Sequence, residues 1–411
     1  MINEYMRPIG VTLETFSAEL TGGWWFGYIE ALQLAGARAV PCYVSRAIKE
    51  PQRLEHLPTG SPMFFLPAPR VDRALRGETG RGNEHHGVRS ALGAYTALPL
   101  IRLGRVLREQ GCEALICQDY EHPRFDWSVL LGRLTGTRVY GSFQGRHGKN
   151  RLEDPGRRLA IRCSGGVIAG PRAEAERVKR EYGLPDERVA RILNPLDLGV
   201  WRPVDRPAAR KEIGIAEADR VVAWHGRMEA HRKGLDVLLE AWEGLTRERP
   251  GRELMLLLVG TGPDAGQISR ELEARELPNV RWVNEHVVDQ AEITRYLSAA
   301  DVYAFPSRGE GLPVSPMEAM ACGLPVVGAD ASGMPDLLEG EEVGALVPRG
   351  DAAALQTALG RLVDDPDLAL RLGSAARRRA EQTFSFEAVG PKLRDFVLPG
   401  VARPDEPGGD V

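Results

Sequence analysis

The sequence predicts an α/β protein with two Rossmann-like domains. Its 411 residues exceed the usual size of a single domain. Near the start, an apolar strand over residues 8–13 precedes the glycine pair Gly22-Gly23 and a helix that runs to about residue 36. Strand, glycine turn and helix in this order are typical of a Rossmann opening. A second unit of the same kind, over residues 301–327, predicts that the architecture repeats later in the chain.

The first half continues with alternating strands and helices. We predict strands at residues 39–45, 114–117, 138–143 and 164–170, and helices at 98–110, 126–135 and 172–182. Residues 49–90 are rich in proline, glycine and arginine, and we interpret them as one long functional loop on the acceptor side. The predicted N-terminal domain covers residues 1–200, and the proline-rich stretch 201–208 is interpreted as a linker.

The second domain is predicted over residues 201–385. It opens with a strand at 221–224, followed by Arg227, a short loop and Lys233 at the start of a helix over 235–245. Cations beside a helix start favour an anion. Strands are predicted at 253–259 and 280–283, and helices at 351–363 and 366–384, with Asp365 as an N-cap. A final helix over about 386–398 is expected to return to the first domain, and residues 404–411 are expected to be disordered.

Residues 301–336 carry the strongest signal in the chain. An apolar run ends at Pro306, and the loop Ser307–Gly311 leads to a helix start at which Ser315 and Glu318 have the spacing of a capping box. A helix N-terminus behind a glycine loop favours a phosphate group. Carboxylates accept hydrogen bonds from hydroxyl pairs such as those of a sugar or a ribose. With Glu310 in the loop and Glu318 on the helix, the pattern suggests a nucleotide-sugar site.

Glu310, seven further residues and Glu318 together resemble the E-x7-E signature of retaining glycosyltransferases with the GT-B fold, and family 4 of those enzymes most of all. The flanking words PS, GLP, EAMACGLPVV and SGMPD fit the same family. The resemblance implies two Rossmann-like domains that face each other across a cleft. It also implies transfer of a sugar, with retained configuration, from a nucleoside diphosphate to a hydroxyl or other nucleophile.

The resemblance also implies roles for individual residues. Glu310 would contact the donor sugar and Glu318 the ribose. The side chains of Arg227 and Lys233 would hold the diphosphate. The backbone between the two glutamates would also contact it, at Gly311, Leu312, Pro313 and Val314. The glycine pair Gly22-Gly23 would pack near the donor phosphates and the acceptor. The family's usual histidine after the strand at 138–143 is absent, which leaves open whether Gln144 or His147 replaces it.

Two alternative functions remain open from the sequence. A nucleotide-sugar epimerase of the same fold would need acid–base residues that we cannot identify. An NAD-linked oxidoreductase is suggested by Gly260-Thr261-Gly262, but the third glycine of the G-x-G-x-x-G fingerprint comes one place late, at Gly266.

Composition limits the class of protein. Five cysteines without C-x-x-C spacing argue against a structural zinc or a disulfide framework. We expect no cofactor and no metal, because Arg227, Lys233 and a helix dipole supply positive charge. Without a signal peptide or a run of roughly 20 apolar residues, the expected location is the cytoplasm, with peripheral attachment to the inner membrane face left open.

Charge is divided unevenly along the chain. Residues 1–211 contain 32 Lys and Arg against 23 Asp and Glu, an excess of +9, whereas the remainder contains 21 against 34, which gives −13. A basic domain favours an anionic partner. We therefore expect an acceptor that bears phosphate or carboxylate, or one presented at a membrane surface, and no nucleic acid.

Overall fold

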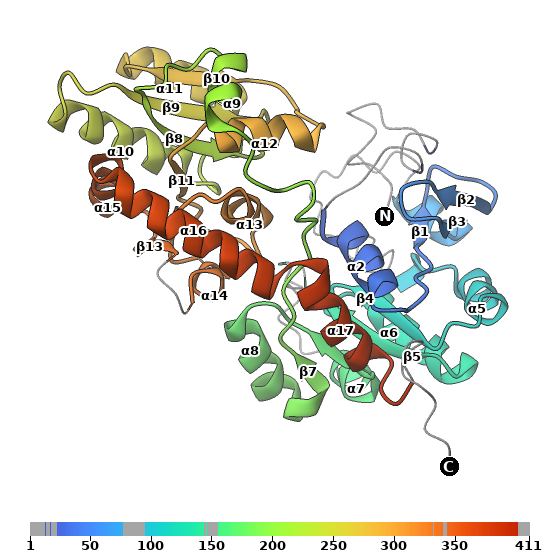
Figure 1. The fold of residues 1–411 in the computed structure, drawn as a ribbon. Coiled ribbons are helices and arrows are strands. Elements are labelled where there is room, and N and C mark those ends of the chain that lie inside the picture. Colours follow the sequence, from blue (N-terminus) through green and yellow to red (C-terminus); the bar gives the residue numbers. More distant parts are fainter. Residues whose placement is uncertain are drawn as a thin grey trace. The chain divides into compact units, whose positions relative to one another are not determined.

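The computed structural model describes residues 13, 17, 23–76, 95–143, 145, 155–331, 333–339 and 343–401. The chain divides into two compact units: unit 1 comprises residues 1–193 and 389–411, and unit 2 comprises residues 194–388 (Figure 1). The last helix, α17 (Phe386–Val397), therefore begins in unit 2 and ends in unit 1. Most of the predicted strand at residues 8–13 and all of the tail at 404–411 lie outside the described residues.

Unit 1 contains two sheets among its described residues. In the first, of order β1-β3-β2, β1 (Cys42–Ser45) pairs in parallel with β3 (Ser61–Pro67), and β2 (Gln52–His56) pairs with β3 antiparallel. The second is a parallel sheet of β4 (Ala114–Gln118), β5 (Arg138–Ser142), β6 (Gly166–Ile168) and β7 (Val189–Ala190). Apart from α17, the described helices of unit 1 are α2 (Gly23–Leu34), α3 (Arg70–Arg76), α5 (Leu100–Glu109), α6 (Pro123–Thr135), α7 (Pro155–Cys163) and α8 (Arg172–Tyr182), with a short 3₁₀ turn, η2 (Asp186–Arg188).

The prediction of one long loop over residues 49–90 is wrong in its described part. Residues 52–76 form β2, β3 and α3 instead. The segment Ser61–Pro67 alternates between buried and partly buried positions over its first half, and Met63 and Phe65 are fully buried. Alternation of this kind is the signature of a strand, but the flanking prolines and glycines obscured it in the sequence. Residues 77–94 lie outside the described part.

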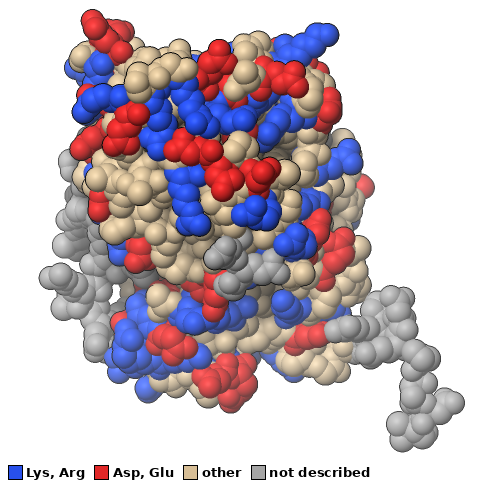
Figure 2. Space-filling view, turned by 60° about the vertical axis from the view of Figure 1, so that its left-hand side comes forward, with Lys and Arg blue, Asp and Glu red and all other residues tan. Residues whose placement is uncertain are grey.

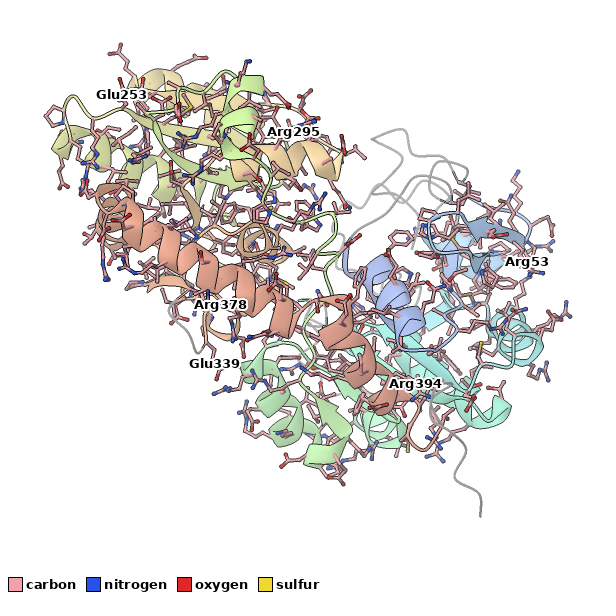
Figure 3. The ribbon with its side chains drawn as sticks, viewed as in Figure 1. Arg53, Glu253, Arg295, Glu339, Arg378 and Arg394 are labelled. Atoms are coloured by element: carbon pink, nitrogen blue, oxygen red, sulfur yellow. The ribbon has the colours of Figure 1, made fainter. Side chains whose placement is uncertain are left out.

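Helix α17 packs closely against α2. A Cβ on Gly390 would lie 2.2 Å from the carbonyl oxygen of Ala31, so only glycine permits this approach. Arg394, labelled on α17 in Figure 3, is buried, and its guanidinium donates to the carbonyl oxygen of Val401 at 3.0 Å. The helix predicted over about residues 386–398 is present with the bounds Phe386–Val397.

Unit 2 is built on a six-stranded parallel sheet of order β10-β9-β8-β11-β12-β13. The strands are β8 (Arg220–His225), β9 (Leu254–Val259), β10 (Val280–Val283), β11 (Val302–Phe305), β12 (Val326–Ala329) and β13 (Gly344–Val347). The chain runs outward from β8 to β9 and β10, then resumes at β11 on the other side of β8. The strand order therefore reverses between β8 and β11, as in a Rossmann fold, which confirms the α/β fold class for this unit.

Helices accompany the strands of unit 2. They are α9 (Arg206–Glu212), α10 (Leu235–Glu248), α11 (Ala265–Arg275), α12 (Gln290–Ser298), α13 (Val314–Ala321), α14 (Met334–Leu337), α15 (Ala352–Asp364) and α16 (Pro366–Thr383). The core gathers Val222 and Trp224 of β8, Leu256 of β9 and Trp242 of α10, each at most 1% exposed. Asp365 accepts from the Leu368 amide at 2.9 Å, which confirms its predicted role as an N-cap.

The stretch predicted as a linker, residues 201–208, is partly integrated into unit 2. Trp201 is 2% exposed, and α9 already begins at Arg206. The Asp301 carboxylate, just before β11, accepts from the Val221 amide at 2.8 Å, from Arg210 at 2.8 Å and from Arg206 at 3.0 Å. Burial lowers the pKa of the Arg210 guanidinium, although Asp301 opposes this shift. These contacts attach α9 to the sheet.

The two arginines provide a matched test of this attachment. Arg210 is 3% exposed and Arg206 is 44% exposed, yet both pair with Asp301. Arg210→Met leaves Asp301 with only the exposed arginine as a cationic partner and removes the buried donors to the Ala299 and Glu217 carbonyl oxygens, so it is expected to lower the free energy of unfolding by about 3–5 kcal/mol. Arg206→Met is expected to cost less than about 1 kcal/mol. Urea unfolding of both variants checks this, and equal losses would contradict it.

Candidate active site

The candidate site lies at the carboxyl ends of β8 and β11, where the strand order of unit 2 reverses. His225 is the last residue of β8, and the loop that follows it carries Arg227 and Lys233. Phe305 is the last residue of β11, and the next loop carries Glu310. In open α/β sheets this position is where ligands bind. The topology thus brings together loops that are far apart in sequence.

Gly234 sets the distance between the two loops. It caps α10 in the left-handed region, with φ +67°, and a Cβ at this position would lie 2.0 Å from the carbonyl oxygen of Pro306. The close approach brings the Lys233 ammonium within 2.6 Å of Glu310 Oε1. Ser307 Oγ lies 2.9 Å from the same carboxylate oxygen. Both Lys233 and Glu310 are largely buried, with 15% and 11% of their side chains exposed.

Two residues missed in the sequence extend this cluster. Arg232 donates to Glu310 Oε2 at 3.3 Å and also pairs with Glu229. Glu229 in turn lies 3.2 Å from the Nε of Arg227. Burial lowers the pKa of Arg232, but its bonds to the two glutamates outweigh this and raise the pKa overall. The cluster holds three cations and two carboxylates, so it keeps a net positive charge suited to a phosphate.

The predicted capping box is wrong. Helix α13 begins at Val314, its N-cap is Pro313, and no side chain caps it. Glu318 instead turns to the end of β8, where its Oε2 lies 2.8 Å from His225 Nε2. The sequence offered no periodic signal for this pair, because 93 residues separate the two side chains. Glu318 therefore has no role in capping and is positioned by the sheet.

The loop at residues 311–314 is shaped by a neighbouring glycine. Leu312 and Pro313 are buried, whereas Gly311 and Val314 are partly exposed. Gly333 has φ +85°, and a Cβ there would lie 2.6 Å from the carbonyl oxygen of Gly311. This packing holds the loop against the start of α14. The first amides of α13 follow Glu310 closely in sequence, as the prediction of an anion site requires.

The glycines that suggested a dinucleotide fingerprint have another structural use. A Cβ on Gly260 would lie 2.0 Å from the carbonyl oxygen of Gly226, and one on Gly262 would lie 2.6 Å from that of Met228. They allow the loops after β8 and β9 to pack against each other. Asp264, just beyond, accepts from the Ala230 amide at 2.8 Å. These contacts explain the glycines without a bound dinucleotide.

Most of the predicted site residues of unit 1 lie in parts of the chain that the structure does not describe. Gly22, Gln144 and His147 lie outside the described residues, and Gly23 is the first residue of α2.

Within the described ranges, no group of three or more His, Cys, Asp or Glu side chains is arranged to hold a metal ion. In the same ranges, no helix is both long enough and apolar enough to cross a membrane.

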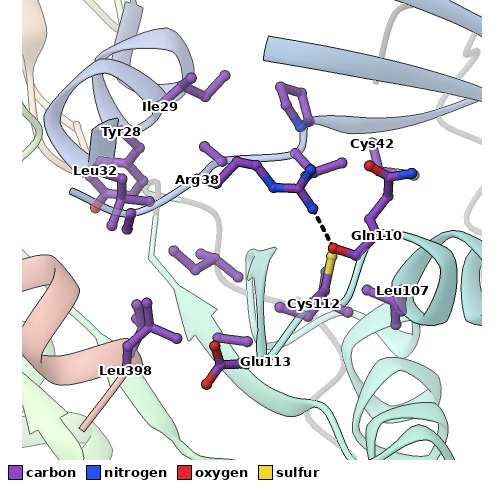
Figure 4. A pocket seen from close by; sticks show the side chains of 18 of the residues that line it. Tyr28, Ile29, Leu32, Arg38, Cys42, Leu107, Gln110, Cys112, Glu113 and Leu398 are labelled. Atoms are coloured by element: carbon purple, nitrogen blue, oxygen red, sulfur yellow. Dashed lines mark hydrogen bonds between the residues drawn. The ribbon is translucent and has the colours of Figure 1, made fainter. Parts of the chain in front are cut away.

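Unit 1 also contains a cavity of about 370 Å³ at the amino ends of β1 and β4 (Figure 4). Its walls are mainly aliphatic side chains such as Leu32 and Leu107, and Arg38 donates to the Gln110 carbonyl oxygen at its rim. Burial raises the pKa of the Cys42 thiol to about 12, so it stays protonated near neutrality. The cavity is at the edge opposite the strands' carboxyl ends, and its apolar lining does not suit a diphosphate.

The candidate site lies in a part of the chain that matches a known family. Residues 219–365 match the family model described as "Glycosyl transferases group 1". The chain is 34% identical over 215 residues to a D-inositol 3-phosphate glycosyltransferase of Nocardia farcinica, covering 51% of this chain and 47% of that protein. It is 31% identical over 202 residues to a GDP-mannose-dependent monoacylated alpha-(1-6)-phosphatidylinositol monomannoside mannosyltransferase of Corynebacterium glutamicum, covering 47% and 51%. The chain thus spans about half the length of these relatives.

Solved structures extend the likeness in fold to most of the chain. Sucrose-phosphate synthase of Thermosynechococcus elongatus has a TM-score of 0.68 at 20% identity, covering 92% of this chain and 93% of that one. HepE of Anabaena, solved with UDP-glucose, has a TM-score of 0.66 at 16% identity, covering 92% and 96%. The chain therefore has the GT-B fold of these glycosyltransferases. The family match itself is confined to residues 219–365.

Gly234 allows a direct test of how the two loops are spaced. Gly234→Ala is expected to lower the free energy of unfolding by at least about 3 kcal/mol, because the new Cβ must displace the Pro306 backbone. Gly251 is a matched control, since its φ is +83° but nothing lies within 4 Å of its Cβ position. Gly251→Ala is expected to cost only about 1–2 kcal/mol. Thermal and urea unfolding measure both, and a milder effect at 234 than at 251 would refute the interpretation.

Proposed function

We propose that the protein is a retaining glycosyltransferase that transfers a sugar from a nucleoside diphosphate to a hydroxyl or other nucleophile. The observation that carries this proposal is the cluster of Lys233, Arg232, Arg227 and Glu310 at the switch point of unit 2. A net positive cluster beside a helix start suits a diphosphate. The match of residues 219–365 to group 1 glycosyl transferases supports the same interpretation.

In the proposed reaction, the bond between the sugar's anomeric carbon and the diphosphate oxygen breaks, and the acceptor oxygen forms the new bond. Negative charge then develops on the diphosphate. Arg227, Lys233 and the amides at the start of α13 would stabilise that charge more strongly in the transition state than in the ground state. The departing phosphate would take the acceptor's proton on the same face, as the family resemblance implies.

Glu310 would bind hydroxyl groups of the donor sugar. Its Oε1 already accepts from Lys233 at 2.6 Å, so the ammonium holds the carboxylate in one orientation. In the absence of donor, the same pair compensates two opposite charges in a largely buried place. A bound diphosphate would give the ammonium a second anionic partner without requiring it to leave the first.

The acceptor is proposed to be anionic and to bind unit 1. Residues 1–211 carry the excess of +9, and unit 1 by itself, residues 1–193 and 389–411, contains 31 Lys and Arg against 25 Asp and Glu, an excess of +6. The face drawn in Figure 2 shows basic and acidic side chains interspersed. The two relatives cited above are named for an inositol 3-phosphate and a phosphatidylinositol mannoside, which both carry phosphate. We propose an acceptor of the same chemical class, a phosphorylated polyol or its lipid form.

The donor assignment predicts selective stabilisation by nucleotide-sugars. UDP-glucose, GDP-mannose, UDP-N-acetylglucosamine, NAD and NADP are compared by thermal shift, followed by a transfer assay with the best donor. At 100 times its dissociation constant, a specific ligand adds about 2.7 kcal/mol to the stability of the folded state. One of the nucleotide-sugars is expected to raise the melting temperature, and NAD and NADP are expected to leave it unchanged.

Two variants accompany this assay, one that removes a cation of the candidate site and one that serves as its control. Lys233→Ala is expected to lower kcat about 100-fold, because it removes charge stabilisation at the leaving group. Lys211→Ala, at an exposed position of α9, is expected to retain full activity. The transfer assay is repeated in EDTA, where activity is expected to persist. Stabilisation by NAD alone, or complete dependence on an added divalent metal, would overturn the proposal.

The acceptor assignment predicts a dependence on salt. With inositol 3-phosphate as acceptor, KM is expected to rise several-fold between low salt and about 0.5 M, because ions screen the attraction between surface charges beyond about 8 Å. With inositol itself, KM is expected to be high and insensitive to salt. Arg73→Glu in unit 1 should raise KM for the phosphorylated acceptor, whereas Arg270→Glu in unit 2 should not. Equal use of both acceptors at all salt concentrations would mean that the acceptor is neutral.

A further inference from the structure

The contact between His225 and Glu318 has no place in the function proposed so far. His225 ends β8, is 7% exposed, and its Nε2 lies 2.8 Å from Glu318 Oε2. Glu318 is on α13, and 16% of its side chain is exposed. Its other oxygen, Oε1, makes no hydrogen bond with any described residue. One oxygen of the carboxylate is therefore held by the protein while the other remains available.

The backbone and ring of His225 are fixed independently of Glu318. Tyr303, on the adjacent strand β11, donates its hydroxyl to the His225 carbonyl oxygen at 3.2 Å. The two rings pack edge to face with their centroids 5.4 Å apart. Burial raises the pKa of the Tyr303 hydroxyl above its usual range, so the group remains a donor. His225 is thus a rigid support rather than a side chain that follows Glu318.

The other ring nitrogen of His225, Nδ1, indicates which of the two nitrogens carries the hydrogen. His225 Nδ1 is buried and has no hydrogen-bond partner among the described residues. A proton on Nδ1 would be a buried donor without an acceptor, which is costly. The hydrogen-bond pattern therefore assigns the proton to Nε2, which donates to the carboxylate. An N–H donor on one oxygen fixes the rotation of the Glu318 carboxylate about its terminal bond.

We propose that His225 is a positioning residue that orients Glu318 so that Oε1 accepts a hydrogen bond from a ribose hydroxyl of the donor nucleotide. This inference rests on the proposed function, together with the ribose contact that the family resemblance implies for Glu318. It adds that the ribose is recognised through a histidine–glutamate pair whose members come from the end of β8 and from α13. Without the histidine, the carboxylate would rotate freely and the ribose hydroxyl would lose its oriented acceptor.

The test compares ribose with deoxyribose in four proteins. Binding of UDP and GDP, and of their 2′-deoxy and 3′-deoxy forms, is measured by calorimetry for the wild type, His225→Gln, His225→Asn and His225→Phe. The glutamine amide nitrogen can reach the place of Nε2, whereas the asparagine amide stops one bond short. Phenylalanine keeps the ring but has no donor. Thermal unfolding of each variant shows whether it is folded.

The wild type is expected to bind the better ribonucleotide roughly tenfold more tightly than at least one of its deoxy forms. His225→Gln should keep this preference. His225→Asn and His225→Phe should lose it by binding the ribonucleotide about tenfold more weakly, while their affinity for that deoxy form stays the same. If the phenylalanine variant does not fold, the comparison of glutamine with asparagine decides the matter.

Three results would overturn the inference, and they can be told apart. A wild type that binds diphosphates without any ribose preference would remove the ribose role that the family resemblance implies for Glu318, while the proposed diphosphate site would stand. A wild type with a clear preference that His225→Asn and His225→Phe retain would remove the role of His225 alone. Equal weakening of ribose and deoxyribose forms would indicate general damage to the site, and it would also overturn the inference.

Discussion

The close packing of the first turn of α10 against the end of β11 is the constraint on which the candidate site depends. Because Gly234 has no Cβ, the Pro306 carbonyl can approach it to a distance that no other residue would allow. The approach places Lys233 beside Glu310, and the Arg308 guanidinium strengthens it by a two-pronged contact with Asp236 at 2.6 and 2.8 Å. The position of the charged pair Lys233–Glu310 therefore depends on a glycine at residue 234.

Other side chains of the protein hold the two glutamates of the candidate site in place. Each carboxylate that the family resemblance singles out has a protein partner of its own: Lys233 for Glu310 and His225 for Glu318. Partnered carboxylates of this kind hold one orientation and lose less conformational freedom when a ligand arrives. The supporting residues come from β8 and the loop that follows it, so the strand reversal supplies the orientation as well as the location of the site.

The sequence was informative where a residue's role depends on its near neighbours. Asp365 caps its helix as predicted, and the continuous apolar run Leu254–Val259 forms a largely buried strand. It was misleading where a distant partner competes for the same group. The capping-box spacing of Ser315 and Glu318 is real in sequence, but the fold offers Glu318 a histidine 93 residues away. No local pattern could indicate that partner.

A different obstacle concealed the first sheet of unit 1. Prolines and glycines surround the segment Ser61–Pro67, and composition alone favoured a loop. The glycines after β9 misled in the opposite direction: they resemble a ligand-binding motif, but they accommodate the neighbouring loop. A glycine can mark a close approach, and sequence alone does not reveal whether a ligand or the chain's own backbone approaches.

Every described contact of the candidate donor site lies within residues 194–388, which form a unit with its own core. The site can therefore be transferred to another protein together with this unit. A gene fusion that joined this unit to a different N-terminal partner would carry the cluster around Glu310 and the His225–Glu318 pair along unchanged. Under the proposed function, selection can then change the acceptor by exchanging or remodelling unit 1, while the donor site is inherited as a block.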